Sequence, residues 1–167
     1  VHERRWHAPR RHSAELLPAI DEMLRLNRIA RTDLRLLIAC SGPGGYTGLR
    51  VGISVAKTLA YAMGIGCVGV NRLLADAAGR LRGEQPVCAV HRAGRKDLAV
   101  ALYKGAPLEA IEMRAPELIP ITDLADELED VSIVTGEVPE EVVAPLQADG
   151  HEVWTGICGQ RRPWLVA

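Results

Sequence analysis

The segment SGPGGYTG, residues 41–48, constrains the fold of this chain of 167 residues more than any other feature. It follows a short apolar run, LLIAC at 36–40, which is typical of a strand buried on both faces. It precedes a stretch with helical periodicity that runs from residue 47 to about residue 63. A buried strand, a glycine-rich loop and a helix in this order indicate an α/β fold.

The rest of the chain continues the α/β pattern. Ser13 is the expected N-cap of a helix over 13–26, and Pro18 is expected to kink that helix or delay its start. A buried strand at 67–70 and a helix capped by Asn71 and reaching about residue 82 follow. Further strands are predicted at 87–90, 97–103, 108–113 and 131–136, and helices at 122–128 and 139–147. Gly and Pro at 83–86 mark the lobe boundary, which gives a first lobe over 1–84 and a second, mixed α/β lobe over 85–167.

Composition narrows the class of protein. Hydrophobic residues make up 48% of the chain and charged residues 25%, as in ordinary globular proteins. No apolar run approaches the roughly 20 residues of a membrane span, and the first twelve residues lack the apolar core of a secretory signal. Cysteines 40, 67, 88 and 158 form no C-x-x-C pair, and the first three are expected to be small buried hydrophobes. We therefore expect a cytoplasmic protein without a zinc site or a disulfide framework.

Charge is distributed unevenly along the chain. Residues 1–104 hold 17 Lys and Arg against 8 Asp and Glu, whereas residues 105–167 hold 3 against 13. The basic half could face an acidic partner or a nucleic acid, and two solvated surfaces of opposite sign are the alternative. The arginines that could contact tRNA phosphates directly are Arg4, Arg5, Arg10 and Arg11.

The glycine loop is a candidate phosphate site, because glycines permit crowded backbone and a helix start offers unpaired N–H groups. Thr47 could cap the helix or hydrogen-bond a phosphate oxygen, and Arg50 adds positive charge. The loop is not a P-loop, since no Lys-Ser/Thr pair follows the glycines. A purely structural turn is the alternative. The candidate phosphate-binding residues are Gly42, Gly44, Gly45, Thr47, Gly48 and Arg50.

Small residues recur every four positions along the helix after the loop, from Gly48 to Gly64, and form one ridge. Such a ridge lets a second helix approach closely, either in another chain or within this one, where the helix over 13–26 is the candidate. The predicted interface residues are Leu16, Leu17, Ile20, Gly48, Val51, Gly52, Val55, Ala56, Leu59 and Ala60.

The run S-G-P-G-G-Y-T-G-L-R-V-G-I-S-V-A-K-T-L-A at 41–60 resembles the signature of the TsaB (YeaZ) family, with Gly45 where the family usually has Ser. His12-Ser13, Leu16-Leu17-Pro18 and Gly69-Val70 extend the resemblance, which is strong over about 12–80 and weakens after Gln85. The stretch at 90–97 departs from the family pattern, and the chain looks truncated at both ends.

The resemblance implies an actin-like, RNase H-like two-lobed α/β fold, with the first lobe lacking its N-terminal strands. It implies a non-catalytic scaffold and dimerisation subunit of the bacterial tRNA threonylcarbamoyladenosine (t6A) complex. The main partner would be TsaD, which transfers threonylcarbamoyl to the tRNA adenosine 3′ of the anticodon, and TsaE would be a second partner. The same helical face would support a homodimer, and tRNA would be reached indirectly through the complex. No membrane association and no cofactor are expected, apart from weak nucleotide binding at the glycine loop.

Catalysis by the isolated chain is not expected. The family of TsaD is recognised by a metal-binding H-x-x-x-H after a Val-Asn pair, and here those positions hold Arg72 and Asp76. No G-x-S-x-G elbow is present and no two histidines have metal-ligand spacing, so no catalytic or metal residue is predicted. The alternative function is a nucleotide-binding enzyme of the actin-like and sugar-kinase group that uses the 42–48 loop. A plain RNA-binding module is a third possibility.

Overall fold

The computed structural model describes residues 2–4, 6 and 12–155. The chain forms two compact units, unit 1 (Val1–Val70) and unit 2 (Asn71–Ala167). The division falls earlier than the lobe boundary expected at residues 83–86. The reason is the helix after Asn71, which packs on strands of unit 2 and therefore belongs to that unit.

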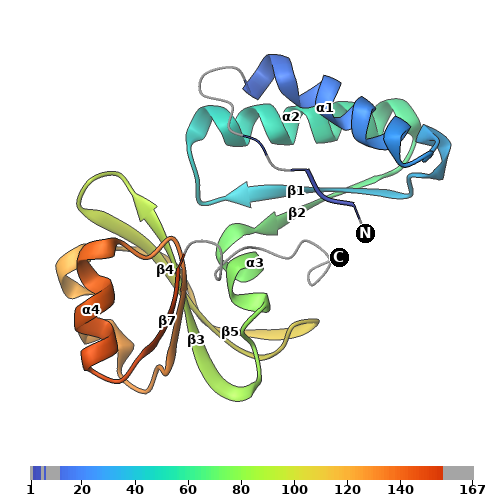
Figure 1. The fold of residues 1–167 in the computed structure, drawn as a ribbon. Coiled ribbons are helices and arrows are strands. Elements are labelled where there is room, and N and C mark those ends of the chain that lie inside the picture. Colours follow the sequence, from blue (N-terminus) through green and yellow to red (C-terminus); the bar gives the residue numbers. More distant parts are fainter. Residues whose placement is uncertain (1, 5, 7–11, 156–167) are drawn as a thin grey trace. The chain divides into compact units, whose positions relative to one another are not determined.

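The described residues of unit 1 form two α-helices, one short 3₁₀ helix and two strands. Figure 1 labels the α-helices and the strands. Its elements are α1 (His12–Leu26), the short 3₁₀ helix η1 (Arg31–Asp33), β1 (Leu36–Gly42), α2 (Tyr46–Met63) and β2 (Gly66–Asn71). β1 pairs with β2, and α2 packs on β1. The predicted helices and strands of this unit are confirmed, but Ser13 is not the N-cap, because α1 already includes His12. Pro18 lies inside α1 and does not delay its start.

The strands of unit 1 are not buried on both faces, so that part of the sequence prediction is wrong. Leu36 is 46% exposed, Ile38 40% and Val68 47%. Cys40 and Cys67 are exposed as well, and among the described cysteines Cys88 alone is buried as expected. The physical reason is that burial on both faces needs a packed layer on each side, and in the described residues of unit 1 the layer on this two-stranded sheet is α2, which packs on β1. Cys158 lies outside the described residues.

Unit 2 is built on a sheet of five strands in the order β5-β4-β3-β6-β7. β3 and β4, and β4 and β5, pair antiparallel, whereas β6 is parallel to β3 and β7 is parallel to β6. The elements are α3 (Arg72–Ala78), β3 (Gly83–Ala93), β4 (Asp97–Ala106), β5 (Glu109–Pro120), η2 (Ile121–Asp123), η3 (Asp126–Leu128), β6 (Ile133–Gly136), α4 (Glu140–Ala148) and β7 (Glu152–Trp154).

Several elements of unit 2 differ from the sequence prediction. The strands predicted at 87–90 and 108–113 are longer, and they form β3 (Gly83–Ala93) and β5 (Glu109–Pro120). The helix after Asn71 ends at Ala78 instead of near residue 82. The helix predicted at 122–128 is two short 3₁₀ helices, η2 and η3. The strand β7 was not predicted, because three residues are too few to show an alternating pattern.

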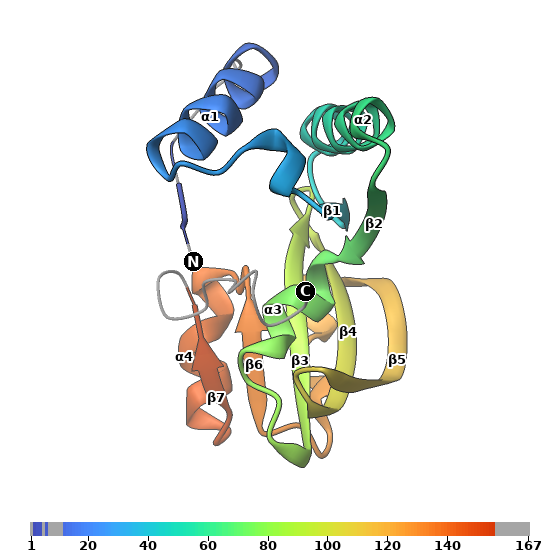
Figure 2. The ribbon, with the colours of Figure 1, turned by 90° about the vertical axis from the view of Figure 1, so that its right-hand side faces the viewer.

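Helices α3 and α4 lie on opposite sides of this sheet (Figure 2), and buried side chains fill both faces. Side chains alternate along β3, so Val87 and Ala89 face α3, and Cys88 and Val90 face α4. The face toward α3 is closed by Leu73 and Ala77 together with Tyr103 and Ile133, and the face toward α4 by Leu98, Leu124, Val134 and Leu146. No described helix is long and apolar enough to cross a membrane.

Candidate functional site

The glycine loop joins β1 to α2 in unit 1. Gly42 ends β1 with a φ of +116°, a left-handed conformation that favours glycine, and a Cβ there would lie 3.4 Å from Leu49 Cδ1. The Gly42–Pro43 peptide bond is cis. Gly45 is the N-cap of α2, and its carbonyl accepts a hydrogen bond of 3.0 Å from the Leu49 N–H. The expectation that Thr47 caps this helix is therefore wrong.

The six candidate phosphate-binding residues all lie in this loop or in the first turns of α2. Gly45 offers no side-chain cap, and the first turn of α2 carries no acidic residue. The N–H groups of that turn are thus not occupied by a capping side chain. The Arg50 guanidinium lies over the ring of Tyr46, the first residue of α2, at 5.3 Å from the ring centroid. Phosphate binding by these residues stays a prediction.

Helices α1 and α2 and strand β1 line an apolar groove of about 800 Å³ within unit 1. We call it the unit 1 groove. Eight of the ten predicted interface residues line it, namely Leu16, Leu17, Ile20, Gly48, Gly52, Val55, Ala56 and Leu59. At its edge Arg31 Nη2 lies 2.6 Å from Asp21 Oδ1. The structure therefore gathers residues that the sequence placed on two separate helices.

The predicted ridge of small residues divides into three parts. Gly48, Gly52 and Ala56 line the groove, Ala60 is 3% exposed and buried inside unit 1, and Gly64 ends α2 in a left-handed conformation. A Cβ at Gly48 or Gly52 would meet no atom within 4 Å, so neither glycine is required for packing inside the chain. Val51 is outside the groove lining. The surface open to a partner is thus the first half of the ridge.

The predicted basic N-terminal segment is described only in part. Arg4 pairs with Glu22 of α1 and lies 5.8 Å from the centroid of the Trp6 ring. The Arg4 hydrogen bond and charge lower the pKa of the Glu22 carboxyl below its usual value. Arg4 thus binds the protein itself in this structure. Arg5, Arg10 and Arg11 lie outside the described residues.

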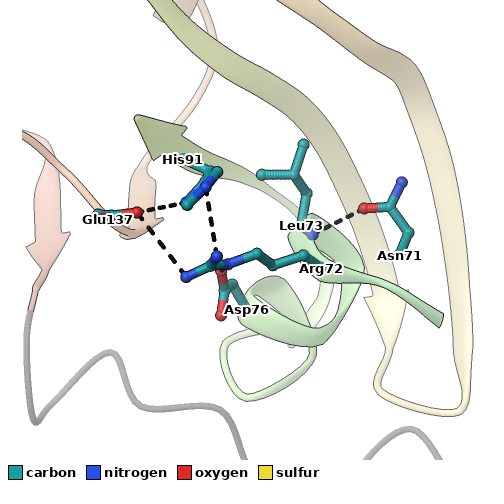
Figure 3. Close-up of polar contacts among 6 residues, drawn as sticks. All are labelled: Asn71, Arg72, Leu73, Asp76, His91 and Glu137. Carbon is teal, nitrogen blue, oxygen red and sulfur yellow. Dashed lines mark hydrogen bonds and ion pairs between the residues drawn. The ribbon is translucent and has the colours of Figure 1, made fainter. Parts of the chain in front are cut away.

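Unit 2 contains a polar cluster that the sequence did not predict as a site, formed by Arg72, Asp76, His91 and Glu137 (Figure 3). Arg72 Nη1 lies 3.4 Å from His91 Nε2, and His91 Nδ1 lies 2.5 Å from Glu137 Oε2. Arg72 Nε lies 3.9 Å from Asp76 Oδ2, and Nη2 lies 3.9 Å from Glu137 Oε2. His91 Nδ1 and the Glu137 carboxylate are within ion-pair distance, and Arg72 Nη1 can donate to His91 Nε2 in the tautomer whose Nε2 carries no hydrogen.

Local backbone structure holds this cluster in place. The Asn71 side chain caps α3 by accepting a hydrogen bond of 2.8 Å from the Leu73 N–H, which sets the start of the helix that carries Arg72 and Asp76. Glu137 follows β6 directly, and its N–H donates to the Val90 carbonyl at 2.8 Å. The i, i+4 spacing of Arg72 and Asp76 was visible in the sequence, but the approach of His91 and Glu137 depends on the pairing of β3 with β6.

No group of three or more His, Cys, Asp or Glu side chains is arranged to hold a metal ion in the part of the chain that the structure describes. Arg72 and Asp76, the positions compared above with the H-x-x-x-H motif, contact each other. The cluster thus contains its own cation beside its carboxylates.

Comparisons with known proteins give a consistent set of similarities. A family model described as TsaD, tRNA N6-adenosine threonylcarbamoyltransferase, matches residues 6–125. The tRNA threonylcarbamoyladenosine biosynthesis protein TsaB of Bacillus subtilis (strain 168) is 32% identical over 93 residues, which are 56% of this chain and 41% of the relative. The protein of the same name in Escherichia coli (strain K12) is 35% identical over 74 residues, 44% of this chain and 32% of the relative. This chain therefore spans less than half of the length of these two relatives.

A solved structure described as YeaZ from Pseudomonas aeruginosa is similar to this chain in fold. It has a TM-score of 0.60 at 28% sequence identity, and the match covers 72% of this chain and 60% of that one. The family model and this structural match each cover well over half of the chain, and the family model spans the glycine loop and the unit 1 groove.

Proposed function

The chain belongs to the TsaB (YeaZ) family and has its actin-like, RNase H-like α/β fold, and on that premise we propose that it is a non-catalytic scaffold subunit in bacterial t6A synthesis. In this role it binds TsaD through unit 1 and supports threonylcarbamoyl transfer to tRNA. TsaE is a further partner of the complex, the same face supports a homodimer, and tRNA is reached through TsaD.

The unit 1 groove is the observation that carries the proposal. Leu16, Val55 and Leu59 give the groove an apolar lining. Gly48 and Gly52 also line it, and the space beside their Cα atoms is empty. An apolar surface of this extent on a folded unit favours burial against another polypeptide. Close approach of a partner helix requires small residues, and the groove presents them on α2.

Unit 1 also has large hydrophobic side chains that are individually exposed outside the groove. Tyr61 is 91% exposed, Tyr46 74% and Leu26 65%. Burial of apolar area contributes roughly 25 cal/mol per Å², so covering such side chains supplies a driving force for association. Aromatic residues are the side chains most enriched at the centres of interfaces.

The test is co-purification of this chain with a bacterial TsaD, comparing the wild type with two leucine variants. Gly52→Leu adds a large side chain to the groove lining, and a Cβ at Gly52 meets no atom within 4 Å. Ser54→Leu is the matched control, since Ser54 is exposed on the same helix and lies outside the groove lining. We expect the wild type and Ser54→Leu to bind TsaD and Gly52→Leu to lose binding by at least about tenfold.

Each variant is first checked for cooperative thermal unfolding. A wild-type chain that unfolds cooperatively and still fails to bind TsaD contradicts the scaffold proposal. Equal binding by Gly52→Leu and the wild type contradicts the placement of the interface in the groove. Size-exclusion chromatography of the same variants without TsaD tests the homodimer, because the same substitution is expected to produce a monomer.

The second candidate function, nucleotide binding at the 42–48 loop, is favoured by the start of α2, which has neither a side-chain cap nor an acidic residue in its first turn. A thermal shift with Mg²⁺ and ATP tests it. A rise in Tm that Arg50→Ala abolishes supports a phosphate site. The absence of any shift at millimolar ATP contradicts the enzyme alternative.

A further inference from the structure

We propose that the outer edge of β5 in unit 2 binds an extended segment of another protein in which Lys or Arg alternates with apolar side chains. The bound segment adds a strand to the five-stranded sheet, beside residues 109–113. The site lies in a different unit from the unit 1 groove, and the inference does not rest on the proposed function.

β5 is an edge strand of the sheet. The order β5-β4-β3-β6-β7 places it at one end, and Figure 2 shows it along one margin of the sheet. It has 12 residues and pairs antiparallel with β4, and no second strand of the described residues pairs with it. Alternate residues of such a strand direct their N–H and C=O groups away from the paired neighbour. An extended peptide can bind these groups by strand addition.

The second half of β5 is poorly suited to a further strand. Its register with β4 shifts twice over residues 112–117. Pro116 has no N–H to donate, and Arg114 forms ion pairs with Glu117 and Glu127. Bulges, prolines and charged side chains are the features that keep edge strands from pairing with other chains.

The first half of β5 has neither a register shift nor a proline. Residues 109–112 pair with β4 in continuous register. The apolar side chains of this half are open to solvent, since Ile111 is 53% exposed and Met113 50%, and Leu108 just before the strand is 76% exposed. This half therefore presents both unpaired backbone groups and apolar side chains to a partner strand.

Charge indicates which kind of segment fits this edge. Glu109 and Glu112 are exposed, and neither has a Lys or Arg within ion-pair distance among the described residues. Lys104 of the neighbouring strand is paired with Glu84, and its Nζ lies 2.6 Å from Oε2. A basic side chain opposite Glu112 would form a cross-strand pair of opposite charge, which stabilises antiparallel strands. A second copy of β5 would bring its own glutamates to this edge, so like charges disfavour a homodimer here.

The alternation of the partner follows from the two faces of the strand. Neighbouring residues of a strand point to opposite faces, so Ile111 and Glu112 present an apolar and an acidic side chain on different sides. Glu112 lies on the side of its β4 partner Tyr103, and Ile111 on the side of Lys104. A segment in which basic and apolar residues alternate matches both sides at once.

The test measures binding of the full chain to a fluorescent peptide of alternating Lys and Val, about eight residues long, by fluorescence polarisation. In one control peptide Glu replaces Lys, and in the other every backbone nitrogen is methylated, which removes the donors and keeps the charge. We expect the Lys-Val peptide to bind and each control peptide to bind at least about tenfold more weakly. Binding should also weaken as NaCl rises from about 50 to about 500 mM.

Charge variants of the protein test the role of the two glutamates. Glu109→Lys combined with Glu112→Lys reverses the charge of the edge and should weaken binding at least about tenfold. Glu129→Lys combined with Asp149→Lys is the matched control, because both acids are exposed in unit 2 outside β5 and the net charge changes equally. This control should bind the Lys-Val peptide within about threefold of the wild type. Each variant is first checked for cooperative thermal unfolding.

A second pair of variants places the site along the strand. Ile111→Ser removes an apolar side chain from the first half of β5 and should weaken binding by about threefold or more. Leu118→Ser is the matched control, since Leu118 is 68% exposed and lies in the second half of the same strand. It should leave binding unchanged.

Hydrogen exchange of the wild type locates the peptide without any substitution. Amides of residues 109–115 should exchange more slowly when the peptide is bound, whereas those of β7 at the opposite edge should not change. Absence of binding, equal binding of the methylated peptide, equal losses in the members of either variant pair, or protection outside residues 109–115 each overturn the proposal. Protection of β5 that increases with chain concentration in the absence of peptide would assign the edge to a second copy, and also overturns it.

Discussion

In unit 2 five strands lie between α3 on one face and α4 on the other, and side chains such as Leu73, Leu98 and Val134 are completely buried. In unit 1 two strands pair with each other, and Ala19 and Ala60 are the buried apolar residues among those described. Both units contain helices and strands with regular apolar patterns. The comparison teaches that such a pattern specifies an element, while burial depends on how many other elements cover it.

Cysteine reactivity should give the largest difference between the units. Burial raises the pKa of the Cys88 thiol in unit 2 to about 12, with the nearby Glu127 adding to the rise and Arg114 opposing it. Cys40 and Cys67 of unit 1 are exposed. Thiolate is the reactive form, so a rise of this size lowers the reactive fraction of Cys88 by about a thousandfold, before access is considered.

Iodoacetamide labelling at pH 8 followed by peptide mass spectrometry measures this difference. We expect Cys40 and Cys67 to be modified fully before Cys88 is detectably modified, and denaturation in urea should expose Cys88. Rapid labelling of Cys88 in the native chain would show that the unit 2 core opens readily, and the contrast between the units would then fail.

Truncation of a leucine tests the same contrast through stability. Leu98 is completely buried in unit 2, whereas Leu17 in unit 1 is 47% exposed. Leu98→Ala should lower the free energy of unfolding by about 3 kcal/mol, because it removes buried apolar area and leaves a cavity. Leu17→Ala should lower it by less than about 1 kcal/mol. Urea unfolding followed by circular dichroism compares them, and similar losses for both variants would contradict the comparison.

Glycine-to-alanine substitutions compare how tightly the backbone is packed in the two units, through their effect on the free energy of unfolding. Gly136→Ala in unit 2 places a Cβ 2.3 Å from the Val90 carbonyl oxygen at a φ of +105°, and we expect a loss of about 2–3 kcal/mol. Gly150→Ala is the matched control, since it has a φ of +92° but no atom within 4 Å, and should cost about 1 kcal/mol.

Gly52→Ala in unit 1 should raise the free energy of unfolding, whereas the two substitutions in unit 2 should lower it. Gly52 lies inside α2 with no atom near its potential Cβ, so alanine should stabilise the helix by roughly 0.5–1 kcal/mol. Thermal unfolding of the three glycine variants ranks them. A loss at Gly52 as large as the loss at Gly136 would mean that the groove wall is packed in the free chain.

Much of the secondary structure could be predicted from the sequence, and the reasons differ between the units. The period of apolar residues specified α1, α2 and the strands of both units, and the Asn71 cap was identified from its side-chain chemistry. The exposure of Ile38 and Cys67 could not be predicted from the sequence. An apolar run indicates that a strand has apolar side chains, but it does not show whether another layer of the fold covers them. The division between the units lies before α3 and not at residues 83–86, because α3 packs on β3, the strand that follows it in the sequence.

The site was predictable only where its residues share one helix or motif. Gly48, Gly52 and Ala56 lie on one side of α2 and line the groove, as their spacing of four residues predicted. Ala60 shares that spacing but is buried inside unit 1, and this burial depends on tertiary packing. The polar cluster remained hidden because His91 and Glu137 are brought together by strand pairing, and no local spacing encodes that pairing.

Replacement of Tyr103 by Phe is expected to change the free energy of unfolding least. It removes the buried hydroxyl and keeps the aromatic ring. Burial in unit 2, with Glu112 adding to it, raises the pKa of Tyr103 to about 12. Its hydroxyl has no hydrogen-bond partner among the described residues. Tyr103→Phe should therefore be neutral or stabilising by up to about 1 kcal/mol at pH 7, since the unpaired buried hydroxyl is removed.

The pH dependence of Tyr103→Phe follows from the sign of the shift. A folded-state pKa above the ordinary value of 10 means that ionisation favours the unfolded chain. The contribution of Tyr103 to the free energy of unfolding of the wild type is present below pH 10 and is lost as the pH rises toward 12. The free energy of unfolding of Tyr103→Phe should therefore fall less than that of the wild type over this interval. Tyr61→Phe is the control, because Tyr61 in unit 1 is 91% exposed and should follow the wild type. Parallel curves for Tyr103→Phe and the wild type in urea unfolding from pH 9 to 12 would mean that water reaches this hydroxyl, and the unit 2 core would then be less closed than its burial indicates.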